Sequence, residues 1–283
     1  MSGAGDDPAP IEHLIARFDL EALDRDLFLG DPGPGDRRLF GGLVAAQSYM
    51  AAARTVEKPG ERPLHSLHAY FLRPGRYQLP IRFVVDRIRD GRSFTTRRVV
   101  AHQGGEAIFN LSASFARIEE GASHQDAAPP SPPPEELPAH PGGPWRHVPD
   151  ERNPIEMRSP DGLRKQGEAL SRERIIWMNA RGPLPDDPRI HTALLVYASD
   201  RNLVSTAVRA LDEPRDGFQM ASLDHALWLH RPVRFDDWLL FVSESPVAHG
   251  ARALIFGSVF HRDGTRLASV AQEGLLRLRK DGP

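Results

Sequence analysis

His68-Ala-Tyr-Phe-Leu-Arg-Pro74 recurs in the second half of the chain as His225-Ala-Leu-Trp-Leu-His-Arg-Pro232, which is one residue longer. Downstream of the two stretches, the spacing from Gly91 to Gly105 equals the spacing from Gly250 to Gly264. A repeat of this length indicates two copies of one supersecondary unit rather than a solenoid array, which needs several short copies. We therefore expect the two halves of the chain to share one fold.

Each copy contains the same order of predicted elements. An apolar helix is predicted first, at residues 41–56 in the first copy and 190–211 in the second. The apolar side chains go nearly all the way round both helices, so each is expected to be buried on all sides. Asp187 before Pro188 is a start signal for the second helix. Strands follow, with hairpin turns at 103–105 and 262–264; they are predicted at 81–86, 97–102 and 108–115, and again at 238–243, 253–260 and 267–276.

A buried helix followed by an antiparallel sheet that must wrap around it is the hotdog arrangement. The predicted fold class is therefore α+β, a double hotdog of two antiparallel sheets, each wrapped around a long buried helix, with the sheets pairing edge to edge. Ala128-Pro-Pro-Ser-Pro-Pro-Pro134 cannot form a helix or a central strand and predicts an extended, semi-rigid linker. The expected boundaries are a loose tail at 1–9, an N-terminal hotdog at 10–118, a Pro-rich linker at 119–151 and a C-terminal hotdog at 152–279.

Composition narrows the classes of function. The chain has 283 residues, a formal charge of −2 and no cysteine. This length buries a sizeable core without staples, and the missing cysteine excludes disulfides, thiolate nucleophiles and Cys-ligated metals. A charge near zero offers no broad attraction for nucleic acid or an anionic membrane. Neither a signal peptide nor a membrane-spanning run is recognisable, so we expect a soluble, cytoplasmic protein without nucleic-acid or membrane partners.

Asp200 is the strongest single candidate for a catalytic residue. On the predicted helix its neighbours at three and four residues are apolar, and a dehydrated carboxylate needs partners or shifts its pKa. Such acids concentrate at functional sites, although Arg201, Asn202 or a backbone group would also satisfy it structurally. The first helix contains no acid between Phe40 and Arg54, so the fold itself does not require one.

Three further polar residues stand in the second copy. Ser222 and Asp224 lie two apart at the head of a predicted strand and are expected on one side of it; for Asp224 an ordinary polar strand start is the preferred interpretation. Gln272 occupies the repeat position of Ala113, where an amide needs a partner if it is buried. A structural hydrogen bond and a function both remain open for Gln272.

Common catalytic and metal-binding motifs do not match. The histidines form no recognisable zinc pattern, and Gly91-Arg-Ser-Phe-Thr95 lacks the final glycine of a serine-hydrolase elbow. The chain has no phosphate loop and no dinucleotide fingerprint. We therefore predict no metal and no cofactor.

The sequence resembles a known family, acyl-CoA thioesterase II, over nearly the whole chain outside the linker. The motifs of both halves occur in the family order: Phe40-Gly-Gly42, His65-Ser-Leu-His-Ala-Tyr-Phe-Leu-Arg-Pro74, Arg89-Asp-Gly-Arg-Ser-Phe94, Ser114-Phe115, Tyr197-Ala-Ser-Asp200, Ser222-Leu-Asp-His225, Trp228-Leu-His-Arg-Pro232 and Gln272-Glu-Gly274. The resemblance implies a double hotdog that hydrolyses fatty acyl-CoA thioesters to free acid and CoA and that associates into homo-oligomers.

The resemblance also implies a catalytic set. The family's Asp, Thr and Gln fall on Asp200, Ser222 and Gln272, which implies that Asp200 activates water as a general base while the other two orient it. Two departures stand out. Ser222 keeps the hydroxyl of the usual Thr but loses the methyl that restricts its rotamer, and Leu43 replaces a common Gln, which is expected to alter the cleft wall.

Two other functions compete with this interpretation. Hydratases of related folds that act on enoyl-CoA use an Asp with a His a few residues later, whereas the fifth residue after Asp200 is Ser205. A non-catalytic acyl-CoA binding or scaffold protein is the second alternative, because of the Ser222 departure.

Overall fold

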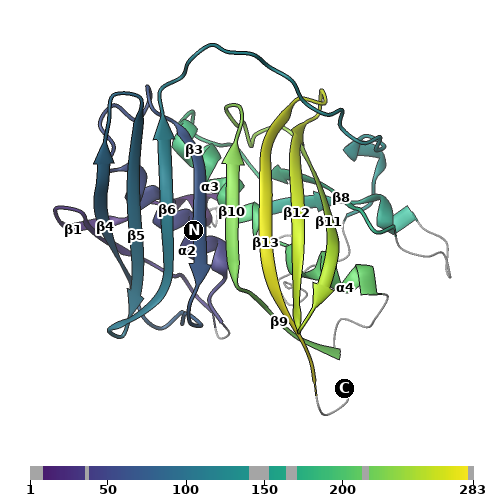
Figure 1. The fold of residues 1–283 in the computed structure, drawn as a ribbon, viewed down its shortest axis with the longest axis horizontal. Helices are drawn as coiled ribbons and strands as arrows, with labels where there is room; N and C mark the ends of the chain where they lie inside the picture. The colour runs from purple at the N-terminus through teal and green to yellow at the C-terminus, as the bar shows by residue number, and fades with distance from the viewer. Residues whose placement is uncertain (1–8, 36–37, 140–152, 164–170, 212–216, 280–283) are drawn as a thin grey trace, which may run out of the picture.

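The computed structural model describes residues 9–35, 38–139, 153–163, 171–211 and 217–279 (Figure 1). The predicted tail at 1–9 and the predicted linker at 119–151 therefore lie partly outside the described residues. The helices are α1 (Pro10–Ala16), α2 (Gly41–Ala53), α3 (Pro188–Ser199) and α4 (Leu203–Leu211), with 3-10 turns at Pro134–Glu136 and Pro160–Leu163. The strands are β1 (Glu21–Asp24), β2 (Leu27–Gly30), β3 (Leu64–Phe71), β4 (Ile81–Asp90), β5 (Phe94–Gln103), β6 (Glu106–Ala116), β7 (Ile155–Arg158), β8 (Arg174–Ala180), β9 (Phe218–Ser222), β10 (Asp224–Leu229), β11 (Leu239–His249), β12 (Arg252–His261) and β13 (Arg266–Leu278).

The strands form one continuous antiparallel sheet. Its order is β1-β2-β4-β5-β6-β3-β10-β13-β12-β11-β8-β7, and β9 pairs separately with β13. The two predicted sheets join where β3 pairs with β10, at the middle of the view in Figure 1. Two strands that would otherwise expose unpaired N–H and C=O groups at a sheet edge thereby satisfy each other.

The strand register reproduces the sequence repeat. A bulge interrupts β5 and β6 between Ala101 and His102, and a matching bulge interrupts β12 and β13 between Val259 and Phe260. Ala113 lies opposite Arg97, and Gln272 lies opposite Ile255. Both pairs are the same number of residues away from their bulge, so Gln272 is the structural counterpart of Ala113. The equivalence that the glycine spacing predicts therefore holds.

The register corrects the alignment of the two quoted stretches. In β3, Leu67 lies opposite Ala113. In β10, Ala226 lies opposite Ala271, so His225 comes beside Gln272. The structural counterpart of His225 is thus Leu67 and not His68. Matched from their Arg-Pro ends, the stretch from Leu67 to Pro74 and the stretch from His225 to Pro232 have equal lengths.

The helices lie behind the sheet in Figure 1 and provide the core. Every residue of α2 from Gly42 to Ala53 is buried, as its apolar composition predicts. It packs against β3 to β6 and against α3, while α4 covers β9 and β11 to β13. The prediction of one helix over 190–211 is wrong: α3 ends at Ser199 and α4 begins at Leu203, because Asn202 adopts a left-handed φ of 69° that no α-helix accommodates.

The Pro-rich linker crosses from β6 to the other half over the top of the sheet in Figure 1. Its residue Leu137 packs with Trp177, Trp238, Leu240 and Phe260, on the sheet face opposite the main core. Trp177 Nε1 donates to Ser131 Oγ at 3.0 Å. The described part of the linker is therefore a strap that covers an apolar patch of the second half.

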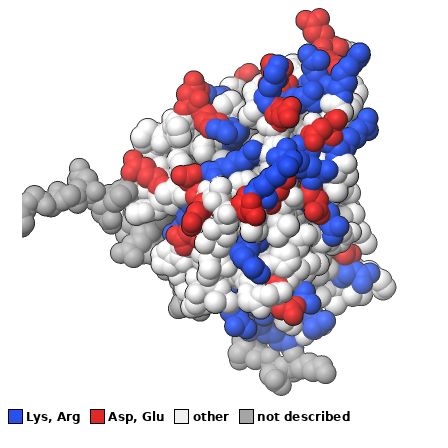
Figure 2. Space-filling view, turned by 90° about the vertical axis from the view of Figure 1, so that its left-hand side faces the viewer, with Lys and Arg blue, Asp and Glu red and all other residues white. Residues whose placement is uncertain are grey.

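The surface carries both signs of charge. On the face drawn in Figure 2, Lys and Arg side chains are interspersed with Asp and Glu. Among the helices that the structure describes, none is long and apolar enough to cross a membrane.

Candidate active site

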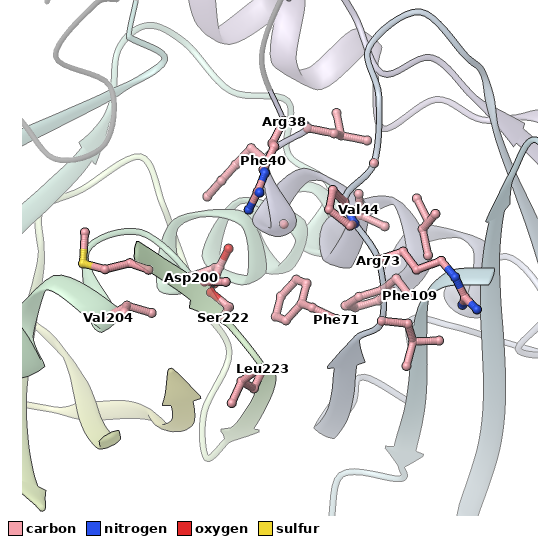
Figure 3. A pocket seen from close by; sticks show the side chains of 18 of the residues that line it. Arg38, Phe40, Val44, Phe71, Arg73, Phe109, Asp200, Val204, Ser222 and Leu223 are labelled. Atoms are coloured by element: carbon pink, nitrogen blue, oxygen red, sulfur yellow. The ribbon is translucent and has the colours of Figure 1, made fainter. Parts of the chain in front are cut away.

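A cavity of about 740 Å³ lies where the start of α2 faces the end of α3 and the end of β9 (Figure 3). The first half contributes the aromatic walls Phe40, Phe71 and Phe109, and the second half contributes Asp200 and Ser222. Both halves of the chain are thus needed to build this cavity.

Asp200 is the C-cap residue of α3 and is only 8% exposed. Burial raises the pKa of its carboxyl from 3.8 to about 7, while hydrogen bonds from Ser222, the Gly42 N–H and Gln272 act in the opposite direction. A carboxyl with a pKa near 7 can both accept and release a proton at neutral pH.

Ser222 and Gln272 hold the Asp200 carboxyl. Ser222 Oγ donates to Asp200 Oδ1 at 3.1 Å, and Gln272 Nε2 donates to Ser222 Oγ at 2.9 Å. Ser222 ends β9 opposite Gly274 in β13, two residues beyond Gln272, so both side chains come to the same face of the sheet. Strand pairing therefore positions two of the three groups, and the break after α3 positions the third.

The hydrogen-bond chain continues through His225, a residue that the sequence analysis did not single out. Its Nδ1 lies 2.7 Å from Gln272 Oε1, and its Nε2 lies 2.9 Å from Ser199 Oγ. Burial lowers the pKa of His225 to about 4, so the ring is neutral and carries one N–H. Gln272 Oε1 can only accept, which puts that hydrogen on Nδ1. The hydrogen bonds from His225 through Gln272 and Ser222 to the Asp200 carboxylate then all point one way, while the Ser199 hydroxyl also donates to the Val196 carbonyl at 3.1 Å.

The repeat carries the signal that identifies His225. Its structural counterpart is Leu67, and both side chains are fully buried. A histidine that replaces a core leucine needs polar partners. Aligning the two stretches from their histidines hides the buried position of His225, because it matches His225 with the exposed His68.

The start of α2 faces the same carboxyl. Its N-cap makes no side-chain hydrogen bond, and two glycines follow. A Cβ added at Gly41 would lie 2.5 Å from the Phe71 ring and 3.0 Å from Asp200 Oδ2, whereas a Cβ at Gly42 would lie 2.5 Å from the Tyr197 carbonyl oxygen. The glycines thus allow the N–H groups and the positive end of the helix dipole to come close to Asp200.

The corresponding place in the other half has a different chemistry. Arg54 is the C-cap of α2 as Asp200 is of α3, and it donates to Asp19 and to the Leu20 carbonyl. The start of α3 is capped by the carboxylate of Asp187, which accepts from Arg189 N at 2.9 Å. The two ends that would form a second site are therefore occupied by other contacts.

The structure brings together Asp200, Ser222 and Gln272, the three residues that the sequence singles out. Two details of the predictions are wrong. Ser222 and Asp224 do not share one strand: Ser222 ends β9, and Asp224 begins β10 and accepts from Glu273 N at 2.6 Å. Leu43 is buried in the core and does not line the cavity, since the apolar α2 turns it inward.

Of the structural alternatives for satisfying Asp200, the described contacts show a backbone group, the Gly42 N–H, and not Arg201. Arg201 Nη1 donates to Asn153 Oδ1 at 2.7 Å, and its guanidinium lies 5.8 Å from the centre of the Tyr197 ring. The groups that act on the Asp200 carboxyl come from α2, β9 and β13.

Comparison with known proteins shows the family of the chain. Residues 150–275 match the model of the acyl-CoA thioesterase family, and residues 30–116 match that of the acyl-CoA thioesterase N-terminal domain. The chain is 38% identical to acyl-coenzyme A thioesterase 8 of Mus musculus, over 93% of this chain and 88% of that protein.

Two solved structures are similar over nearly their full lengths. An acyl-CoA thioesterase II from Mycobacterium marinum is 41% identical, with a TM-score of 0.80 over 96% of this chain and 99% of that one. A hot dog fold protein from Alicyclobacillus acidocaldarius is 21% identical, with a TM-score of 0.76 over 94% and 98%, and it shows the fold alone. The chain has a hotdog fold, belongs to the acyl-CoA thioesterase II family and is a thioester hydrolase.

Proposed function

We propose that this protein hydrolyses acyl-CoA thioesters with a water molecule activated by Asp200 and oriented by Ser222 and Gln272. The observation that carries the proposal is the Asp200 carboxyl itself. It lines the cavity between the halves, its pKa is raised to about 7, and the described contacts hold it from three elements.

In the proposed step, the ionised Asp200 takes a proton from water as the water oxygen attacks the thioester carbonyl carbon. The C–S bond then breaks, and the free acid and the thiol of CoA leave. A thiolate is a good leaving group, so its protonation contributes little to the rate. Oδ1 of Asp200 is engaged by Ser222, which leaves the other oxygen, beside Gly41, for the water.

The α2 start supplies electrostatic stabilisation in this proposal. Negative charge develops on the thioester oxygen during attack, and N–H groups at a helix N-terminus stabilise such a charge. The Gly42 N–H already acts on the Asp200 carboxylate, and Gly41 precedes it in the same turn. The first half of the chain thus provides electrophilic assistance, and the second half provides the base.

The hydratase alternative has less support. Ser205, five residues after Asp200, accepts from Arg174 Nη1 at 2.6 Å and donates to the Asn202 carbonyl at 2.7 Å. The histidine nearest to the site in the hydrogen-bond chain, His225, is separated from Asp200 by Gln272 and Ser222 and is neutral. Neither residue offers a second acid or base beside Asp200.

The test is release of free thiol from acyl-CoA by the wild type and by Asp200→Asn, which keeps size and hydrogen bonding with Ser222. We expect the substitution to lower kcat by roughly 10²–10⁴-fold, the range for loss of a general base. Retention of most hydrolysis by Asp200→Asn would refute the proposed base.

At a larger scale, we propose that the two halves are two hotdog units, near residues 10–118 and 152–279. The matched bulges and the equivalent helix C-caps support this division. The homo-oligomer remains a prediction from the family resemblance, and light scattering of the purified chain tests it. The cytoplasmic location remains a prediction from the sequence composition.

A further inference from the structure

A second hollow of about 650 Å³ adjoins the active-site cavity. The two hollows share Arg38, Arg73, Pro74, Gly75 and Ile108 in their walls. A molecule that occupies the cavity beside Asp200 can therefore extend into the second hollow.

The second hollow is lined by basic side chains. Arg38, Arg73 and Arg76 face one acid, Glu106, so the balance of three positive charges and one negative charge is +2. Arg73 Nε lies 3.1 Å from Glu106. In the described part of the chain, no carboxylate forms an ion pair with the exposed Arg38 or Arg76. Two guanidinium groups are thus available at the rim.

The backbone that carries these arginines is held in place. Gln103 is buried, its Nε2 donates to the Arg76 and Leu79 carbonyls at 2.8 and 2.6 Å, and its Oε1 accepts from Arg76 N at 2.8 Å. A backbone bridge joins Arg38 to Arg76. Because buried side-chain and backbone bonds secure both segments, the backbone positions of the two arginines are fixed at the rim of the hollow.

Apart from Asp200, the second half lines the active-site cavity with uncharged side chains, which include the polar Asn202 and Ser205. In Figure 3, Val204 lies on one side of Asp200 and Ser222, while Phe71, Phe109 and Arg73 lie on the other. Met220 joins Val204 in the lining of the cavity. The cavity thus runs from an uncharged end, past the carboxyl, to a basic end.

We propose that Arg38 and Arg76 bind phosphate groups of the CoA moiety, and that the acyl chain therefore extends toward Val204 and Met220. The inference rests on the proposed function for the identity of the thiol. Guanidinium groups suit this task because they bind phosphate oxygens with paired, charge-assisted hydrogen bonds. The pantetheine arm spans the aromatic wall between the carboxyl and the arginines.

The kinetic test compares an acyl-CoA with the N-acetylcysteamine thioester of the same acid, which lacks phosphates. Arg38→Gln and Arg76→Gln are each expected to raise KM for acyl-CoA by roughly fivefold to fiftyfold. The KM for the cysteamine thioester and the kcat for both should stay within about twofold. Arg98 is an exposed arginine on β5 away from both hollows. Arg98→Gln is therefore the matched control, and it is expected to change KM and kcat for neither substrate.

Calorimetry of CoA itself separates this inference from the proposed function, since binding needs no turnover. If CoA binding weakens in Arg38→Gln and Arg76→Gln while neither the wild type nor any variant hydrolyses a thioester, the subsite stands and the proposed function fails. If the two variants match Arg98→Gln in CoA affinity, or lose both substrates equally, the subsite is wrong.

The orientation has its own readout. Met220→Phe narrows the uncharged end of the cavity, so the preferred acyl chain should become shorter while CoA affinity stays within about twofold. A weaker CoA affinity without a change in chain-length preference would show that the acyl chain lies at the other end.

Discussion

The Asp200 carboxyl is both accessible to a ligand and largely shielded from water. It is accessible from a cavity, yet it is buried enough that its pKa is raised to about 7. Partial dehydration makes a stronger base, and the hydrogen bonds from Ser222 and Gly42 keep the charged form attainable at neutral pH.

The first prediction follows from this pKa. Only ionised Asp200 accepts a proton, so kcat/KM should fall about tenfold per pH unit below about 7 and level off above it. Steady-state thiol release between pH 5 and 9 measures the profile. A rate that is flat across pH 7 would show that another group is the base.

The same shift affects stability with a defined sign. Between 3.8 and about 7 the folded state keeps a proton that the unfolded chain releases, so the free energy of unfolding falls as pH rises through this interval. Asp200→Asn should therefore be more stable than wild type at pH 8, by on the order of 4 kcal/mol for a shift of about three pKa units, and equally stable near pH 4. Chemical denaturation at the two pH values checks this.

Ser222 provides a second prediction. If its hydroxyl only orients water, Ser222→Ala should slow turnover by roughly tenfold to a thousandfold, as loss of one positioned group does. Ser222→Thr should be tolerated and could raise the rate, because the added methyl restricts the hydroxyl rotamer.

The contact between Ser222 and Asp200 would also suit a nucleophile beside its base. Rapid quench and mass spectrometry distinguish the two roles. No acyl-enzyme is expected at any time; a covalent adduct on Ser222 would mean that Asp200 activates the serine and not water.

His225 provides a third prediction. Its Nδ1–H fixes the amide of Gln272, so His225→Phe should let that amide turn and lower kcat by roughly fivefold to fiftyfold, with little change in KM. His225→Asn keeps a donor near the Nδ1 position and should recover much of the activity. Equal losses in both variants would indicate a packing role only.

At the scale of elements, the start of α2 has two glycines with different constraints. At Gly41 an added methyl meets the Phe71 ring and the Asp200 carboxyl, whereas at Gly42 it meets the Tyr197 backbone. A ring can move, but a backbone carbonyl inside a helix cannot do so cheaply.

The fourth prediction uses this pair. Gly41→Ala should fold with nearly wild-type stability and lose activity, by roughly tenfold or more, because the methyl fills the place of the water. Gly42→Ala should mainly lower the melting temperature, since overpacking costs about 1–3 kcal/mol. Thermal melts and thiol release on both variants provide the comparison; a large loss of stability with Gly41→Ala would contradict it.

The helix break is the second device at this scale. Asn202, with a φ of 69°, ends the α3 axis, and its carbonyl accepts from Thr206 N at 3.1 Å as α4 begins. Asp200 consequently lies at a helix end, where its side chain reaches the cavity, rather than in a helix interior.

At the scale of the whole molecule, the two halves have divided one task. The first presents an uncapped helix start, and the second presents the carboxyl, the hydroxyl and the amide. At the two reciprocal helix ends, Asp187 caps the start of α3, and Arg54 at the end of α2 donates to Asp19. Under the proposed mechanism, this asymmetry predicts one site per chain.

The fifth prediction tests that asymmetry. Ala113→Gln places the amide at the repeat position of Gln272 and should add no activity, because the C-cap of α2 is Arg54 rather than an acid and Asp187 caps the start of α3. It should also destabilise the fold, since Ala113 is buried among apolar side chains. Activity in the double variant Asp200→Asn, Ala113→Gln above that of Asp200→Asn would reveal a second site.

The sequence by itself determined the repeat, the buried helix α2, the hairpin strands and the family. These follow from local patterns, namely equal glycine spacings, an apolar run and turn residues, which a chain expresses without its tertiary neighbours. It also singled out Asp200, Ser222 and Gln272, because the second copy is polar where the first is not.

Only the tertiary structure decided how these residues meet. The helix break at Asn202, the join of β3 to β10 and the place of His225 depend on strand register and on contacts between residues far apart in the chain. A one-residue shift in register exchanges the buried and exposed faces of a strand, so the match of His225 with His68 could not reveal its burial. The raised pKa of Asp200 has the same origin, since only the packed halves remove water from it.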